Sequence, residues 1–248
     1  MSKKMTGMLI AVLIVCFAIP MVAYGMESIK YSYSDEELYE LANENVYINN
    51  ENIVVCPADN DTVLFDVKSD NVQAVHNNFI EVTRKISERD YEKYLYGYLI
   101  IYDEDSNTKG SGSISQNDSG LFGGKIATAT VSVNYNTATF DTLTCYKPYS
   151  VSGRATRIDN GLTISKYVLS YKRQGWGYTS GGVQTYLPYY ENHSDYTNVM
   201  TNHTLNTGES YYVRTDNTSN FAGVFTAQVK NSGGTLLGNL IVTARLGG

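Results

Sequence analysis

The clearest pattern of hydrophobic and polar positions lies in the last stretch of the chain, residues 223–246. Its two halves, 223–230 and 235–246, each alternate apolar and polar side chains. A period of two is typical of half-buried strands. Between the halves, 231–234 reads NSGG, which tolerates a tight reversal of the backbone. The pattern predicts a β-hairpin, which must pack on further strands because a hairpin alone is marginal in water.

The same alternation begins at Lys125, where residues 125–135 form one long candidate strand. Further candidate strands lie at 140–146, 150–158, 162–173, 183–187 and 211–214. Short strands at this spacing, separated by Gly, Asn, Asp and Ser, are typical of a β-sandwich, because sheets with one apolar face bury that face by stacking. We therefore predict a mainly β protein with a C-terminal antiparallel β-sandwich.

Upstream of this region the pattern changes to a mixture of helix and strand. Ser34 and Glu37 have the spacing of a capping box, which predicts a short helix over 35–43. Short strands are expected between residues 45 and 67. The apolar spacing of three and four residues from 72 to 86 predicts a second helix.

Residues 91–102 fit both secondary structures. Apolar residues at helical spacing are present, but the aromatic and β-branched run YLYGYLIIY favours a strand. We expect a strand here, within a small α+β N-terminal region that precedes the sandwich.

Composition divides the chain into four parts. Residues 1–25 have the form of a secretory signal peptide, with lysines before an apolar run and small residues at the cleavage site. We expect an acidic α+β region over 26–105, a polar Gly/Ser/Asn-rich connection over 106–124 and the β-sandwich domain over 125–248.

Charge follows this division. Residues 26–120 carry 7 Lys and Arg against 19 Asp and Glu, a net charge of −12, whereas residues 121–248 carry 10 against 6, a net charge of +4. Neither part has a cluster of Lys and Arg, which argues against nucleic acid as a partner.

Two cysteines, Cys56 and Cys145, remain after removal of the expected signal peptide. In an exported protein they can pair, and a cross-link around some ninety residues would restrict the unfolded chain by about 4 to 5 kcal/mol. Both lie in apolar runs, so two separately buried thiols are the alternative. The sequence leaves both alternatives open.

The segment 174–192, QGWGYTSGGVQTYLPYYEN, holds the candidate binding residues. It contains the single tryptophan of the chain among tyrosines and small polar residues. The candidates are Trp176, Tyr178, Tyr186, Tyr189 and Tyr190. Exposed aromatic rings stack on sugar faces or peptide groups, and neighbouring amides bind hydroxyls. The alternative is that these rings fill the core.

No motif for catalysis, a metal or a cofactor rises above background. His193 and His203 lie ten residues apart, which matches no known ligand spacing. Asp103 and Asp105 begin like a calcium loop, but the later positions of that loop do not match. We therefore expect neither an enzyme nor a cofactor.

The Lys-containing signal peptide, the Asn- and Tyr-rich composition and the segment ATATVSVNYNTATF over 127–140 resemble the uncharacterised small secreted β-rich proteins of Gram-positive bacteria. This resemblance implies an extracellular location and no assigned activity. We predict a secreted binding module for a cell-wall polymer, a glycan or a surface protein, with no stable transmembrane anchor after processing. The alternatives are a membrane-active, pore-forming protein and an effector capped by its acidic N-terminal region.

Overall fold

The fold was determined as a computed structural model, which describes residues 33–44, 47–49, 51–58, 63–68, 72–103, 125–214, 216 and 219–246. The expected signal peptide over 1–25 and the expected connection over 106–124 lie outside these residues. The described part is mainly β, with one helix. No helix in it has the length and the apolar character that crossing a bilayer requires.

The N-terminal elements are α2 (Asp35–Glu44), β1 (Ile48–Asn49), β2 (Ile53–Pro57), β3 (Val63–Val67), β4 (Val72–Lys85) and β5 (Asp90–Asp103). The later strands are β6 (Lys125–Phe140), β7 (Leu143–Ile158), β8 (Leu162–Thr163), β9 (Tyr167–Tyr178), β10 (Gln184–Tyr196), β11 (His203–Asn206), β12 (Tyr212–Val213), β13 (Asn220–Asn231) and β14 (Leu236–Leu246).

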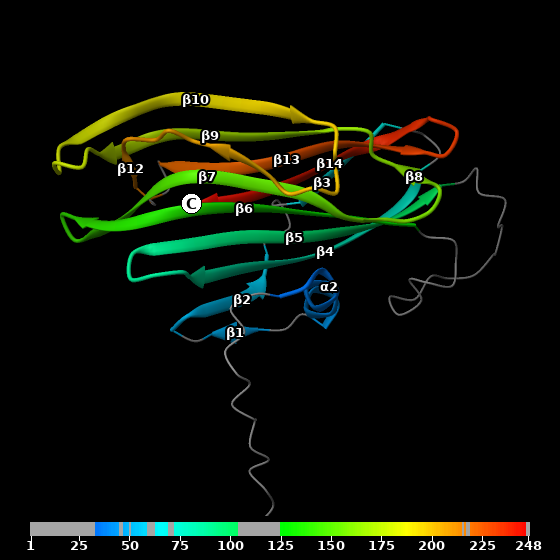
Figure 1. Cartoon of the computed structure of the whole chain (residues 1–248), viewed down its shortest axis with the longest axis horizontal. Coiled ribbons are helices and arrows are strands. Elements are labelled where there is room, and N and C mark those ends of the chain that lie inside the picture. The colour runs from blue at the N-terminus through cyan, green and yellow to red at the C-terminus, as the bar shows by residue number, and fades with distance from the viewer. Residues whose placement is uncertain are drawn as a thin grey trace, which may run out of the picture. The chain divides into compact units, whose positions relative to one another are not determined.

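All fourteen described strands belong to one hydrogen-bonded sheet, and every pairing in it is antiparallel (Figure 1). The main order is β1-β2-β4-β5-β6-β7-β12-β9-β13-β14-β3, with β10 paired to β9, β11 to β7 and β8 to β13. β5 and β6, which flank the expected connection, pair along most of their length, and β3 pairs with β14. Strands from before and after residues 106–124 therefore share the sheet.

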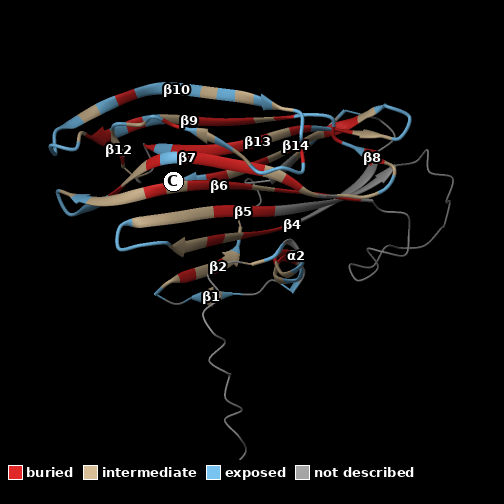
Figure 2. Ribbon diagram, in the orientation of Figure 1, coloured by how far each residue is buried: buried red, intermediate tan, exposed pale blue. Residues whose placement is uncertain are grey.

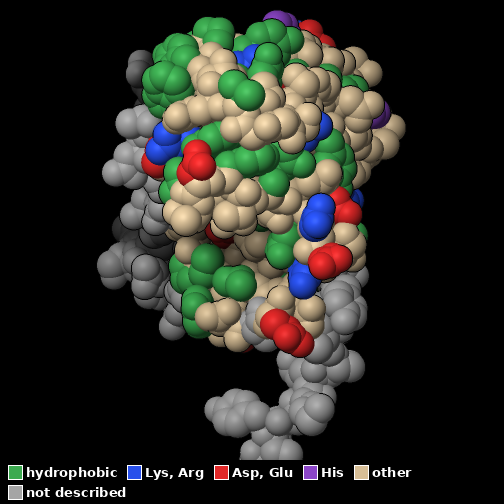
Figure 3. All heavy atoms as spheres, turned by 90° about the vertical axis from the view of Figure 1, so that its left-hand side faces the viewer, with side chains coloured by type: hydrophobic (Ala, Val, Ile, Leu, Met, Phe, Trp, Pro, Cys, Tyr) green, Lys and Arg blue, Asp and Glu red, His purple; other side chains and the backbone are tan. Residues whose placement is uncertain are grey.

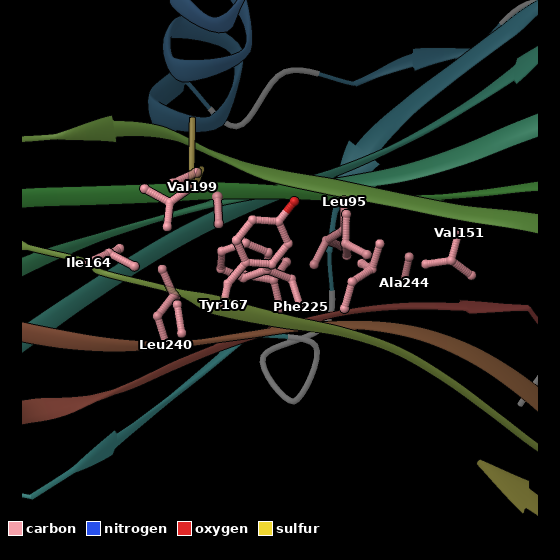
Figure 4. Packing of buried hydrophobic residues seen from close by; sticks show 14 of the residues in the cluster. Leu95, Val151, Ile164, Tyr167, Val199, Phe225, Leu240 and Ala244 are labelled. Carbon is pink, nitrogen blue, oxygen red and sulfur yellow. The ribbon is translucent and has the colours of Figure 1, made fainter. Parts of the chain in front are cut away.

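The sheet folds back on itself, because β13 and β14 contact β6 although they are not its neighbours in the strand order. The main core lies between these two parts. Figure 4 shows part of this core, where Tyr167 of β9 lies beside Phe225 of β13, with Leu240 of β14 on one side and Leu95 of β5 on the other. Burial follows the same layout, since β6, β9 and β13 are largely buried and β10 is largely exposed (Figure 2).

The helix α2 begins as the sequence predicts. The Glu37 amide donates a hydrogen bond to the Ser34 hydroxyl, and the Ser34 amide donates to the Glu37 carboxylate, which completes a capping box. Leu38 and Ala42 of α2 pack in a second cluster of buried residues with Ile80 of β4 and other side chains of β2 and β5. The helix therefore covers part of the sheet face that points away from the main core.

Two predictions about secondary structure are confirmed and one is wrong. The final hairpin forms, with Phe225 opposite Val242 in β13 and β14, and residues 90–103 form strand β5. The helix predicted over 72–86 is instead strand β4, which pairs with β2 and β5. Phe79 enters the main core and Ile80 and Val82 the second cluster, so apolar residues on both faces hid the period of two.

Candidate functional site

The hairpin of β9 and β10 holds all five aromatic candidates, and alternation along β9 sets the face that each one occupies. Tyr167, Leu169 and Tyr171 enter the main core and define the inner face. Trp176, at an even number, therefore lies on the opposite, outer face. It is 40% exposed.

Trp176 and Tyr186 are directly opposite each other in the register of β9 and β10. Their rings form an edge-to-face pair with centroids 5.4 Å apart and planes at 73°. Tyr186 is 59% exposed. Because an aromatic pair of this geometry holds each ring in place, the two side chains present an ordered apolar surface to solvent.

A β-bulge brings Tyr189 onto the same face. Leu187 pairs with Gly175 and Tyr190 pairs with Arg173, so β10 advances three residues while β9 advances two. Glu191, next to Tyr190, points outward, and the Tyr189 hydroxyl donates a hydrogen bond to the Glu191 carboxylate. Tyr189 therefore lies outward as well, and its bond to a carboxylate raises the pKa of its hydroxyl. We name Trp176, Tyr186 and Tyr189 the aromatic face.

Tyr190, on the other side of the bulge, lies on the inner-face side against a charged pair, and its side chain is 43% exposed. Its ring lies 5.3 Å from the Arg173 guanidinium carbon. Arg173 Nε donates to Glu209 Oε1 at 2.7 Å, and a terminal nitrogen of Arg173 donates to the Pro188 carbonyl at 3.0 Å. The side chains of Arg173 and Glu209 are only 13% and 5% exposed. This buried pair therefore holds the bulge from the inner face and links it to the segment after β11.

Tyr178 is on the outer face but is buried, with 2% exposure. Phe140, at the tip of the β6–β7 hairpin, stacks on its ring at 4.9 Å, and the Tyr178 hydroxyl donates to Asp141. Burial, and then this hydrogen bond, raise the pKa of Tyr178. The turn that carries Phe140 has positive φ angles at Asp141 and Thr142, and a β-branched residue such as Thr142 rarely adopts such an angle. Tyr178 thus ties two hairpin tips together.

Polar side chains surround the aromatic face. Gln174 and Gln184 are exposed on the same face, and Lys172 stands opposite Glu191 in the register. Figure 3 views the end of the molecule at which the β6–β7 and β9–β10 hairpins turn. Hydrophobic side chains are spread over the upper part of that end, among other side chains and backbone and a few charged side chains of both signs. The aromatic face is therefore bordered by uncharged amides and by one pair of opposite charges.

The candidate cysteines lie on different strands and are not bonded to each other. Cys56 is on β2 and Cys145 on β7, and β4, β5 and β6 stand between these strands in the sheet. Cys145 is fully buried, and burial raises the pKa of its thiol. This arrangement supports the alternative of two separate thiols.

The two candidate histidines do not share a site. His193 is exposed on the outer face of β10, whereas His203 of β11 stacks on Tyr196 with centroids 4.3 Å apart. Among the described residues no three His, Cys, Asp or Glu side chains lie close enough together to hold a metal ion. The later positions, at which the sequence departs from a calcium-binding loop, lie outside the residues that the structure describes.

Sequence reasoning missed Arg173, Glu209 and Phe140. Arg173 and Glu209 are far apart in the chain, and Phe140 reaches Tyr178 from another hairpin, so no local pattern could have found these contacts. Comparison with models of known protein families, with curated proteins and with solved structures finds no match to this chain.

Proposed function

We propose that this chain is a binding module whose contact surface is the aromatic face of the β9–β10 hairpin. The observation that carries the proposal is that three large aromatic side chains, 40%, 59% and 58% exposed, share one face of the β9–β10 hairpin. Exposed aromatic groups that gather in this way are typical of recognition surfaces, since they offer rigid contact area at little cost in conformational entropy. The partner is a cell-wall polymer, a glycan or a surface protein.

The scaffold of the proposed module is a β-sandwich. Contacts of β13 and β14 with β6 across the main core support two facing layers. We place the module outside the cell, because residues 1–25 have the pattern of a secretory signal peptide.

Sedimentation tests the binding surface. The purified protein is mixed with insoluble cell wall and with insoluble polysaccharides, and the bound fraction is compared for the wild type and for Tyr186→Ala and Tyr189→Ala. The wild type should pellet, and each variant should lose most of its binding. Since both side chains are more than half exposed, truncation should leave the fold intact, which circular dichroism verifies.

Tyr47→Ala is the matched control. Tyr47 is 64% exposed, a fraction similar to the 59% of Tyr186. It precedes β1, an end strand of the main order that pairs with β2 and with neither β9 nor β10. This variant should bind as the wild type does. Equal binding by Tyr186→Ala and Tyr47→Ala would contradict the proposal. Release of dye from liposomes by the wild type would favour the membrane-active alternative instead.

A further inference from the structure

The rings of the aromatic face do not form a single flat plate. Trp176 and Tyr186 cross at 73° in one row of the hairpin. Tyr189 lies on the same face within the bulge, between the Leu187–Gly175 and Tyr190–Arg173 pairs, which is about two residues of β9 further along. Two residues of a strand span about 7 Å. A chain-like ligand that runs along the strands therefore meets apolar contacts at two successive positions.

Hydrogen-bonding groups of mixed character lie beside these rings. The amides of Gln174 and Gln184 are exposed on the outer face, and each offers both donors and an acceptor. The Tyr189 hydroxyl is already engaged with Glu191, whose carboxylate keeps further acceptor sites. Groups that donate and accept in the same place suit hydroxyls, which do both.

The charges near the aromatic face are balanced. Lys172 and Glu191 stand opposite each other in the register. Arg173 is held by Glu209 on the inner face, and Arg214, whose amide donates to the Trp176 carbonyl, forms an ion pair with Asp216. An anionic polymer or an anionic bilayer needs several cations that are not already neutralised.

Because the site is the one assigned under the proposed function, the inference rests on that function. We infer that the aromatic face takes an uncharged polysaccharide that lies along β9 and β10. The apolar faces of successive sugar rings stack on Trp176 or Tyr186 and then on Tyr189. The hydroxyls at the ring edges bind Gln174, Gln184 and Glu191. Recognition of this kind depends on stacking and hydrogen bonds, so it depends little on salt.

The test uses the fluorescence of Trp176, the single tryptophan of the chain. The full protein is titrated with soluble oligomers of β-1,4-linked glucose and β-1,4-linked N-acetylglucosamine, with polygalacturonate as an anionic polymer, and with vesicles of phosphatidylglycerol. One neutral oligomer should change the Trp176 emission. Its affinity should stay within about twofold between 50 and 500 mM salt, since no counterions are released.

Variants assign the contacts. Tyr186→Ala and Tyr189→Ala should each weaken binding of the neutral oligomer by about tenfold, the loss expected from one stacking contact. Lys172→Gln and the control Tyr47→Ala should change the affinity by less than about twofold.

The outcomes separate this inference from the function on which it rests. In one outcome, only polygalacturonate or the vesicles bind, salt abolishes the complex, and the aromatic variants lose this binding. The aromatic face is then the binding surface, but the inference of an uncharged polysaccharide is wrong. If a neutral oligomer binds equally well to the wild type and to both aromatic variants, the binding surface itself is wrong. Failure of every neutral oligomer to bind also overturns the inference.

Discussion

The two faces of the β9–β10 hairpin carry similar aromatic side chains and use them in opposite ways. On the inner face, Tyr167 stacks on Phe225 at 4.7 Å and Tyr171 stacks on Phe221 at 5.6 Å, all within the main core. On the outer face, Trp176 and Tyr186 pack on each other and remain exposed. Tyr167 and Tyr171 stabilise the fold by burial, whereas Trp176 and Tyr186 stay available to a partner.

The difference shows that residue type does not decide the role of an aromatic side chain in this hairpin. The pleat and the bulge decide which face each ring occupies, and contacts from other strands decide its burial, as Phe140 does for Tyr178. A shift of one residue moves a side chain to the other face of a strand. Without the bulge, Tyr189 would point inward and Tyr190 would point outward.

Truncation of an inner ring should have the largest effect on stability. Phe225 is fully buried between β9 and β14. Phe225→Ala should lower the free energy of unfolding by about 3 to 5 kcal/mol, because it removes buried apolar surface and leaves a cavity. Chemical denaturation measures this loss. A loss no larger than that of Tyr186→Ala would erase the distinction between the faces.

The buried ion pair behind the bulge should come next. Glu209→Gln removes the negative partner of Arg173, whose side chain is 13% exposed, and should lower the free energy of unfolding by about 2 kcal/mol. It should also weaken ligand binding, because Arg173 holds the Pro188 carbonyl and the Tyr190 ring. Glu191→Gln, an exposed carboxylate on the outer face, is the matched control for stability and should leave the unfolding midpoint unchanged. Full stability in Glu209→Gln would show that the pair does not hold the bulge.

Much of the fold follows from the sequence. In β6, β13 and β14 the apolar residues alternate with polar ones and so mark one face of each strand. The capping box of α2 involves residues three apart, so it can be read from the sequence. The failure at β4 has a physical cause. Phe79 and Ile80 are adjacent in the chain and enter different clusters, so both faces of the strand are apolar and the pattern matches a helix equally well.

The candidate site was predictable as a segment but not residue by residue. Trp176 and Tyr178 share a face of β9, and only the arrival of Phe140 from another hairpin buries Tyr178. Pro188 is the single local signal of the bulge, since proline disfavours a regular ladder. The pairing partners that place the bulge are set by the sheet as a whole.

Alkaline pH should destabilise the inner face. Burial raises the pKa of Tyr167 to about 12, whereas an unfolded tyrosine titrates near 10. Between these values the unfolded chain releases a proton that the folded chain keeps, so the free energy of unfolding falls as pH rises. Tyr167→Phe should make this fall shallower. At neutral pH it should cost about 1 kcal/mol, because the Tyr167 hydroxyl donates to the Gly153 carbonyl at 2.7 Å.

Denaturation of both proteins at pH 8, 10, 11 and 12 measures this difference. Other buried tyrosines, including Tyr94 and Tyr135, also have raised pKa values, so the wild type and the variant should both lose stability. The informative quantity is the gap between them, which should close as pH rises. A constant gap would show that Tyr167 ionises alike in the folded and unfolded chains.

The smallest effect on stability belongs to the outer face. Trp176 is 40% exposed and packs on an exposed neighbour, so Trp176→Phe should lower the free energy of unfolding by less than about 1 kcal/mol. In the wild type, acrylamide should quench the Trp176 emission without unfolding, since quenching requires contact with the indole ring. Addition of a bound partner should protect the ring and lower the quenching slope. If acrylamide did not quench the emission of the native protein, Trp176 would be buried in the core. The contrast between the two faces of the hairpin would then be wrong for the Trp176–Tyr186 pair.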